Sequence, residues 1–221
     1  MTCSRAIGLF GGTFNPVHIG HLRTALEIRE QLALDEMRLM PSGQPPHRTE
    51  PQVSARHRAA MVALAIRGEA GLLLDERELQ RAGPSWTVET LQEVRQELGA
   101  DVSLSFCVGM DSLVNLSSWH RWQELTDWAH LIVAARPGWQ MPREGAVAEW
   151  LSTRRSDARR DVRQKPHGVV FVAELTLLPV AATDLRERLQ SGCSVRYLTP
   201  DSVVDYIEKH RLYHGATGGD S

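Results

Sequence analysis

The chain has 221 residues, of which 42% are hydrophobic, and its formal net charge is only −2 because 25 Lys and Arg residues nearly balance 27 Asp and Glu residues. This composition supports a full hydrophobic core and provides no strong basic field, which argues against a protein that binds long nucleic acids. Three widely spaced cysteines, with no apolar stretch of the roughly 18 residues that span a membrane, indicate a cytoplasmic protein with free thiols and no membrane partner.

The first predicted element is a buried strand over residues 6–10, which ends in a pair of glycines. Its apolar side chains do not alternate with polar ones, as in a parallel strand covered on both faces, and the glycines allow backbone shapes that a Cβ would forbid. Helical spacing over residues 20–32 then places His18 and His21 at the first turn of a helix, on one face. A helix start offers N–H groups and partial positive charge to phosphates, and imidazoles add directed donors. This segment therefore predicts a nucleoside triphosphate site.

Two other interpretations of this segment were weighed. A glycine turn between a strand and a helix is common, and a pair of histidines is often only a surface feature. A zinc site is disfavoured because His18 and His21 lack Cys or carboxylate partners at the usual spacing. The position directly after an apolar strand favours the phosphate site.

Strands and helices are predicted to alternate along the rest of the chain. Further strands are expected at residues 38–40, 72–74, 104–108, 131–135 and 169–172, and further helices at residues 54–66, 87–98, 111–116 and 183–189. This alternation predicts an α/β fold with a Rossmann-like, doubly wound parallel sheet, helices on both faces and a ligand crevice beyond the carboxyl ends of the strands. We expect a single domain over residues 1–214 and a flexible tail over residues 215–221.

The least regular segment covers residues 139–167 and carries many charges of both signs. A basic patch for phosphate or a partner is one interpretation. An exposed helix with a solvated charged face is favoured, because runs of mixed charge usually face water.

Several residues outside the first segment could contact a nucleotide. Arg186, with Thr183 at the start of a late helix, could bind two oxygens of a leaving pyrophosphate or simply pair with Asp184 or Glu187, and spacing alone does not decide. Asp111 could accept hydrogen bonds from ribose hydroxyls, cap a helix, or do both. Two tryptophans, Trp86 and Trp119, could stack on a pyridine ring, although aromatic residues are more often part of the core.

Motifs in a recognisable order run through most of the chain. The segments are 10–21 (Phe-Gly-Gly-Thr-Phe-Asn-Pro-Val-His-Ile-Gly-His), Pro45-Pro46-His47-Arg48, 74–79, 84–91, Gly109-Met110-Asp111-Ser112-Leu113, Trp119, Arg136-Pro137-Gly138 and 183–189. In these segments the chain resembles the HIGH-motif nucleotidyltransferases, and among them most closely the bacterial nicotinate-nucleotide adenylyltransferases.

The resemblance implies an enzyme of NAD biosynthesis. It would join ATP and nicotinate mononucleotide into nicotinate adenine dinucleotide (deamido-NAD) and pyrophosphate, with Mg²⁺ held by substrate phosphates and by no protein side chain. These two nucleotides would be its partners, and a homo-oligomer is left open. The resemblance implies three catalytic residues, which are His18, His21 and Arg186. The implied ATP-binding residues are Gly11, Gly12, Thr13, Phe14, Asn15, Gly109, Asp111, Arg136 and Thr183, and the implied mononucleotide-binding residues are His47, Arg48, Trp86, Thr87 and Trp119.

The chain departs from the family pattern at a few positions. Asn15 replaces an Asp of many members, and a neutral amide beside polyphosphate would be tolerated because it avoids like-charge repulsion. Ala181 stands where many relatives have Ser, and Ser42-Gly43 replaces Asn residues of some relatives.

Three other functions are compatible with part of the sequence pattern. Phosphopantetheine adenylyltransferases resemble the nucleotide half but are shorter and lack the match over residues 84–91. Aminoacyl-tRNA synthetases would need a Lys-rich catalytic loop and a tRNA-binding surface. A nucleotide-sensing module without turnover is disfavoured by the intact His18, His21 and Arg186.

Overall fold

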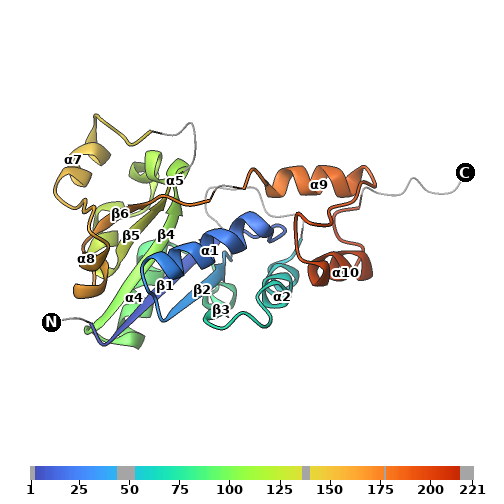
Figure 1. Ribbon diagram of the computed structural model, residues 1–221, viewed down its shortest axis with the longest axis horizontal. Helices are drawn as coiled ribbons and strands as arrows, with labels where there is room; N and C mark the ends of the chain where they lie inside the picture. Colours follow the sequence, from blue (N-terminus) through green and yellow to red (C-terminus); the bar gives the residue numbers. More distant parts are fainter. Residues whose placement is uncertain (1–2, 44–52, 136–139, 177, 215–221) are drawn as a thin grey trace, which may run out of the picture.

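The computed structural model describes residues 3–43, 53–135, 140–176 and 178–214 (Figure 1). In this part of the chain six parallel strands form one sheet in the order β3-β2-β1-β4-β5-β6. The strands are β1 (Arg5–Gly12), β2 (Glu36–Pro41), β3 (Leu72–Leu74), β4 (Val102–Gly109), β5 (His130–Ala134) and β6 (Val170–Ala173). The predicted Rossmann-like doubly wound sheet is confirmed, and its order reverses beside β1, where such folds bind ligands.

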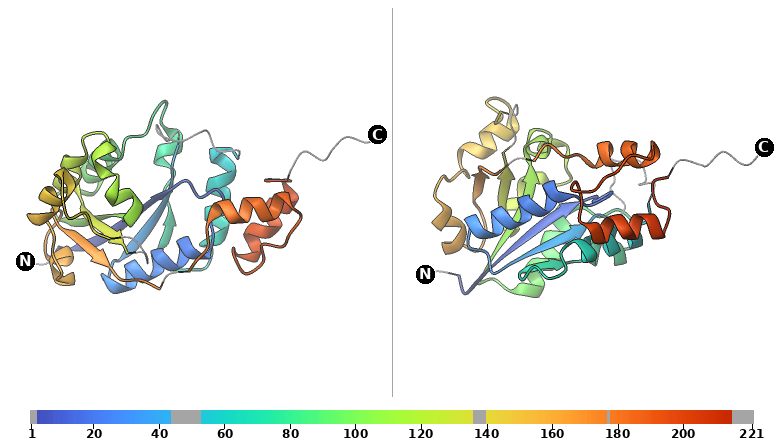
Figure 2. Two further views of the ribbon diagram at one scale, coloured as in Figure 1. Left: turned by 90° about the horizontal axis from the view of Figure 1, so that it is seen from above. Right: turned by 45° about the vertical axis from the view of Figure 1, so that its right-hand side comes forward.

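Helices cover both faces of this sheet (Figures 1 and 2). The structure contains α1 (Ile19–Gln31), α2 (Ala55–Ala65), α3 (Arg77–Gln80), α4 (Thr87–Leu98), α5 (Met110–Val114), α6 (Leu125–Trp128), α7 (Ala146–Ser152), α8 (Arg159–Gln164), α9 (Ala182–Gln190) and α10 (Asp201–Lys209). Short 3-10 helices η1 (Leu116–Ser118) and η2 (Trp122–Glu124) join α5 to α6. One core contains side chains of α1, α2 and α8 to α10, and the other contains side chains of α4 to α7.

Successive residues of a strand contribute to different cores. In β4, Phe106 and Val108 pack in the core under α4 to α7, whereas Cys107 between them packs in the core under α1 and α2. Both faces of the sheet are therefore apolar, which explains why the strand sequences show no alternation of polar and apolar residues. The cysteines Cys3, Cys107 and Cys193 are free, and burial raises the pKa of the Cys107 thiol far above its ordinary value.

The charged segment after β5 differs from the expectation. Its described part forms two short helices, α7 and α8, and not one exposed helix. Trp150 and Val162 are buried beneath it, Arg154 lies 5.0 Å from the centre of the Trp150 ring, and Arg163 pairs with Asp35 at 3.0 Å. The prediction of one solvated helix is wrong because the charged side chains alternate with apolar ones that complete the core.

The last helix, α10, was not predicted. Its apolar side chains Val203, Val204 and Ile207 are buried, and the helix packs against α2 (Figure 1). The expected tail over residues 215–221 lies outside the described residues. Of the described helices, none is both long enough and apolar enough to span a membrane.

Candidate functional site

The loop that follows β1 connects the sheet directly to α1. Strand β1 ends at Gly12, and α1 begins at Ile19 with His18 as its N-cap. A Cβ on Gly12 would lie 3.0 Å from the ring of Phe14, so the glycine is favoured by close packing and not by an unusual backbone angle. Phe14 is itself 1% exposed and its ring packs in the core, so the backbone of Phe14 is the part that its predicted contact with ATP concerns. We call residues 13–18 the motif loop.

The two motif histidines lie against each other at the start of α1. Their ring centroids are 3.6 Å apart and the rings are stacked, so they share one face as the spacing predicted. His18 is 5% exposed, and its backbone N–H donates to Nδ1 of His21 at 3.3 Å. Because Nδ1 accepts this bond, the neutral His21 ring carries its proton on Nε2. Phe14 supports His21 from the edge, with ring centroids 5.0 Å apart.

The start of α1 is not an open set of N–H donors. The N–H of Ile19 donates to the carbonyl of Leu198 at 3.0 Å. The expectation of unpaired helix N–H groups is therefore wrong at this position, because the chain after α9 returns to cover it. A Cβ on Gly20 would lie 3.6 Å from the carbonyl oxygen of Val180, so the segment before α9 also approaches the motif closely.

Arg186, on α9, reaches the motif loop. Its Nη1 donates to the backbone carbonyl of Asn15 at 2.8 Å, and its Nη2 donates to Thr183 Oγ1 at 3.1 Å. The alternative ion pairs with Asp184 and Glu187 are not formed among the described residues. The structure therefore brings Arg186 and the two histidines to the same loop, although they are more than half the chain apart in sequence.

The side chain of Asn15 points into the protein. Its Oδ1 accepts a hydrogen bond from Tyr213 Oη at 2.7 Å, and both residues are buried. The amide oxygen is therefore used to bind the tyrosine, and the placement of this amide beside polyphosphate stays a prediction. The side chain of Ala181, the N-cap of α9, offers no hydroxyl there.

A buried arginine that sequence reasoning missed holds the motif loop from behind. Arg58, on α2, is 1% exposed and donates to the carbonyls of Thr13 and Ser42, each at 2.7 Å. Burial lowers the pKa of its guanidinium, which nevertheless stays protonated as arginines do. Among the described residues no carboxylate pairs with it. A signal was present in the sequence, because Arg58 stands three and four residues before the buried Met61 and Val62, at a position where helical spacing predicts an apolar residue.

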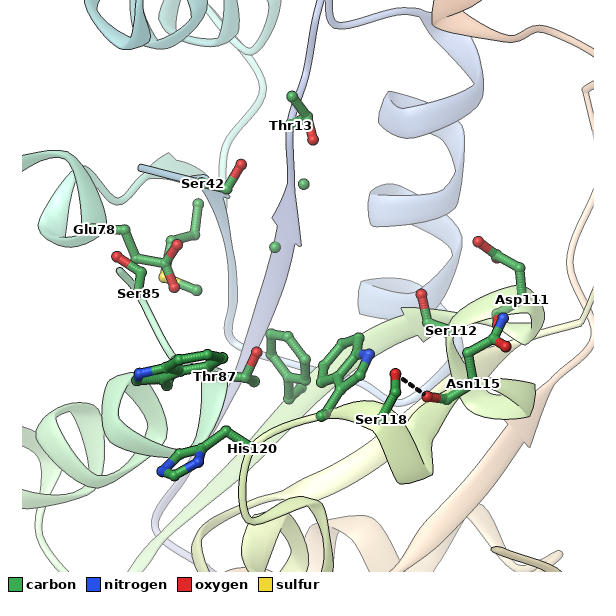
Figure 3. A pocket seen from close by; sticks show the side chains of 16 residues that line it. Thr13, Ser42, Glu78, Ser85, Thr87, Asp111, Ser112, Asn115, Ser118 and His120 are labelled. Carbon is green, nitrogen blue, oxygen red and sulfur yellow. Dashed lines mark hydrogen bonds between the residues drawn. The ribbon is translucent and has the colours of Figure 1, made fainter. Parts of the chain in front are cut away.

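A cavity of about 340 Å³ opens next to the motif loop (Figure 3). Its lining includes the predicted residues Gly11, Gly12, Thr13, Trp86, Thr87, Asp111 and Trp119. His18, His21 and Arg186 are not part of this lining; the wall reaches the motif loop through Thr13. The cavity lies at the carboxyl ends of β1 and β4, on the edge of the sheet where the crevice was expected.

Aromatic side chains form one side of the cavity. Trp86 is the N-cap of α4, and its ring centroid lies 4.9 Å from that of His120. Trp119 meets Phe106 edge to face, with centroids 6.5 Å apart. Both tryptophans are half-buried and line the cavity, so each presents part of its ring to a ligand.

Asp111 lies at the opposite side of the cavity from Thr87 and His120 (Figure 3). Helix α5 begins at Met110 with Gly109 as its N-cap, so the interpretation of Asp111 as the capping residue is wrong. A Cβ on Gly109 would lie 2.4 Å from Asp111 Oδ1, and the glycine therefore leaves room for this carboxylate. Asp111 is then available to accept hydrogen bonds from hydroxyl groups of a ligand.

A polar group of side chains that sequence reasoning missed lies on the cavity wall between β2 and α4 (Figure 3). Glu78 is 8% exposed and accepts a hydrogen bond from Thr90 Oγ1 at 3.0 Å, and burial raises the pKa of its carboxyl group. The hydroxyls of Ser42 and Ser85 are buried and find no hydrogen-bond partner within the described parts of the chain.

Three predicted site residues, His47, Arg48 and Arg136, lie outside the described residues. Among the residues that the structure describes, no three His, Cys, Asp or Glu side chains gather as a metal site.

Comparison with known proteins assigns the chain to a family. Residues 9–188 match the family model described as cytidylyltransferase-like. A "Probable nicotinate-nucleotide adenylyltransferase" of Aeromonas hydrophila is 50% identical, over 95% of this chain and 98% of its own length, and one of Pseudomonas aeruginosa is 48% identical, over 95% and 97%. A solved nicotinic acid mononucleotide adenylyltransferase of Plasmodium falciparum, complexed with NaAD, has the same fold, with a TM-score of 0.69 and 16% identity over 95% of this chain and 97% of that one. The chain therefore belongs to the nicotinate-nucleotide adenylyltransferase family of nucleotidyltransferases.

Proposed function

We propose that this enzyme transfers the adenylyl group of ATP to nicotinate mononucleotide, and that the pyridine ring binds in the cavity while the polyphosphate binds along the motif loop. The main support for this proposal is that an aromatic surface, in the cavity, continues into a cationic surface at the motif loop. The cavity presents Trp86, Thr87 and Trp119, and its wall continues through Thr13 into the motif loop. This loop ends at His18, which stacks on His21, and its backbone binds Arg186. A ring with a phosphate tail fits that order of surfaces. The names of the relatives support the same reaction.

The charges around the motif loop favour anions. Arg58 and Arg186 both contact this loop, and neither forms an ion pair with a described carboxylate. A guanidinium whose charge is not neutralised by the protein acts on a bound polyphosphate through a medium of low dielectric constant. This arrangement supports binding of the triphosphate at the loop.

The reaction needs no protein nucleophile. One oxygen of the mononucleotide phosphate forms a bond to the α-phosphorus of ATP while the bond from that phosphorus to the pyrophosphate oxygen breaks. A phosphate monoester has a second pKa of about 6, so the attacking oxygen is already ionised at neutral pH and a general base would add little. Catalysis then depends on alignment and on stabilising negative charge.

In this proposal His18, His21 and Arg186 stabilise the charge on the α-phosphate and on the leaving pyrophosphate. The Nε2–H of His21 is a directed donor because its Nδ1 is occupied by the backbone of His18. Imidazoles and guanidiniums are not ligands that Mg²⁺ prefers, so this donor set fits a metal held by the substrates' phosphate oxygens. Bound there, Mg²⁺ would supply further neutralisation of phosphate charge.

The remaining assignments concern recognition. Asp111 is placed to accept hydrogen bonds from ribose hydroxyls, and Trp86 and Trp119 are placed to contact the pyridine ring. His47 and Arg48 for the mononucleotide phosphate, and Arg136 for ATP, remain predictions from the resemblance. Free cysteines fit a reducing compartment, and we place the enzyme in the cytoplasm.

The substrate assignment is tested by a side-by-side assay. Pyrophosphate release is measured with ATP and either nicotinate or nicotinamide mononucleotide, and the acid is expected to react faster. Equal rates with the two substrates would contradict the proposed preference for the acid. A lack of pyrophosphate release with either substrate would contradict adenylyl transfer itself.

The role of the motif histidines is tested by His18→Ala. Turnover is expected to fall by about 10² to 10³ while the fold is retained, because a donor to the transition state is lost. The matched control is His167→Ala, since this half-buried histidine bonds to the carbonyl of Thr126 at 3.1 Å and is not part of the cavity lining. Wild-type turnover in His18→Ala would contradict the assigned role.

A further inference from the structure

The chain after α9 makes several contacts with the motif loop and the start of α1. We call residues 198–213 the C-terminal segment. Three hydrogen bonds join it to the motif, from Ile19 N to Leu198 O (3.0 Å), from Thr199 Oγ1 to Val17 O (2.8 Å) and from Tyr213 Oη to Asn15 Oδ1 (2.7 Å). These residues of the C-terminal segment lie beyond residue 188, where the match to the family model ends. The surroundings of the motif are therefore completed by a part of the chain that the family model does not cover.

Asn15 links this segment to the reaction. Its side-chain oxygen accepts the hydrogen bond of Tyr213, and its backbone oxygen accepts the hydrogen bond of Arg186 at 2.8 Å. The two acceptors belong to one residue: the bond to Tyr213 anchors the side chain of Asn15, and through its Cα it restrains the neighbouring backbone carbonyl that binds Arg186. The position of the Arg186 guanidinium thus depends on how firmly Asn15 is held.

The Tyr213 hydroxyl is suited to hold Asn15. It is buried, and burial raises the pKa of Tyr213 well above its ordinary value, so the hydroxyl remains a donor at any physiological pH. The charges of Arg186 and Arg58, the two guanidiniums that contact the motif loop, both act on this hydroxyl. A neutral donor in this position binds Asn15 without neutralising either arginine.

We propose that Tyr213 is a positioning residue for adenylyl transfer: through Asn15 its hydroxyl fixes the carbonyl that orients Arg186 toward the pyrophosphate of ATP. The proposal rests on the role of Arg186 in the proposed function. Tyr213 itself touches no reacting atom, so its effect is expected on turnover and on pyrophosphate binding and not on binding of the mononucleotide.

The test compares two single hydroxyl deletions, Tyr213→Phe and Tyr206→Phe. Tyr206, on α10, is a matched control because its hydroxyl bonds to Nδ1 of His57 at 2.9 Å and does not contact the motif loop. For Tyr213→Phe we expect kcat to fall about tenfold, the effect of one buried hydrogen bond, with the KM for nicotinate mononucleotide unchanged. For Tyr206→Phe we expect kcat and KM to stay at wild-type values.

A double-mutant cycle separates positioning from general destabilisation. In an Arg186→Ala background, Tyr213→Phe is expected to cause no further loss of kcat, because the group that it positions is absent. The same tenfold loss in both backgrounds, or a wild-type kcat for Tyr213→Phe, would overturn the proposal. Melting temperatures of all variants confirm that the folded protein is assayed.

Calorimetric titration with pyrophosphate tests the same link without turnover. Tyr213→Phe is expected to bind pyrophosphate several times more weakly than the wild type, and Tyr206→Phe is expected to bind it equally well. An unchanged affinity in Tyr213→Phe would count against the proposal. Failure of the proposed function would instead show in the wild type, as a lack of dinucleotide formation, and the pyrophosphate comparison would still decide the role of Tyr213.

Discussion

The two ends of the sheet each contain a buried arginine that donates to backbone carbonyls, and the two arginines differ in how completely they are used. At the amino end, Arg95 makes five hydrogen bonds to the carbonyls of Trp128, Gly99, Val102 and Pro166, with donors from all three of its nitrogens. At the carboxyl end, Arg58 bonds to the carbonyls of Thr13, Ser42 and Gly43, while its Nε finds no partner in the described parts of the chain.

This difference follows from what each end has to do. Arg95 joins the connections that lead into β4, β5 and β6, and burial lowers its pKa as it does for Arg58. Every N–H group of Arg95 donates to a backbone carbonyl of the protein. Arg58 supports two loops beside the cavity, and no described carboxylate neutralises its charge. The buried arginine at the amino end thus holds only the fold, whereas the one at the carboxyl end supports the loops beside the cavity.

Replacement of Arg95 by Met is expected to cause the largest effect, a loss of about 3–5 kcal/mol in the free energy of unfolding. Four buried carbonyls lose their donor, while the distant cavity keeps its shape. Urea unfolding followed by circular dichroism measures the loss, and kcat measured below the unfolding transition is expected to equal that of the wild type. A reduced kcat in the folded variant would show that the amino end is not purely structural.

Replacement of Arg58 by Met is expected to lower the free energy of unfolding by about 3 kcal/mol and also to lower kcat at least tenfold. The second effect arises because a buried positive charge behind the motif loop is removed. Arg58→Lys serves as the control, since it restores the charge with fewer hydrogen bonds and should regain part of kcat. If Arg58→Met had the kcat of the wild type, the contrast between the two ends would disappear.

The pH dependence of stability should report on the amino end. Burial lowers the pKa of His130 to about 4, and the neutral ring accepts from Val169 N and donates to Lys165 O. Between pH 6.5 and pH 4, His130 is protonated in the unfolded chain but stays neutral in the folded protein. The free energy of unfolding therefore falls as the pH falls, by up to roughly 3 kcal/mol.

Urea unfolding of the wild type and of His130→Gln over this pH range measures the contribution. The variant is expected to lose less stability between pH 6.5 and pH 4, because the group that titrates is gone. Parallel curves for the two proteins would assign the acid sensitivity to other groups.

The smallest effects are expected from two hydroxyls, that of Ser85 on the cavity wall and that of Thr90, which is bonded to Glu78 of that wall. Thr90→Val should lower the free energy of unfolding by about 1 kcal/mol, because Thr90 Oγ1 bonds to both Glu78 and Arg81. Ser85→Ala should change it by less than about 0.5 kcal/mol, because the Ser85 hydroxyl has no hydrogen-bond partner in the described structure. Thermal unfolding distinguishes the two, and equal losses would mean that Ser85 is satisfied in solution.

The sequence predicted those features that depend on neighbouring residues. The strand with its glycine pair, the helix that begins at the histidines and the alternation of strands and helices are all local patterns, and each appears in the structure close to its expected bounds. The parallel sheet followed from them by general rules of connection. Helix α10 could have been found in the same way, from the spacing of Val203, Val204 and Ile207.

Features that depend on contacts between distant residues could not be predicted. The residue letters do not show that Asn15 turns its amide toward Tyr213, or that Leu198 occupies the first N–H of α1. The error at Asp111 has a different cause, because the N-cap lies two residues earlier, at Gly109, and helix boundaries are the least certain part of a prediction from sequence.

The bond between Asn15 and Tyr213 spans 198 residues, which has a consequence for the enzyme during its synthesis. The ribosome makes the motif early and the tyrosine almost two hundred residues later. A nascent chain that has already folded its sheet therefore still lacks the hydroxyl that fixes Asn15. A message truncated just before codon 213 yields a protein that contains every motif residue but in which the Arg186 guanidinium is not held in position. Full turnover begins only after translation has passed the tyrosine.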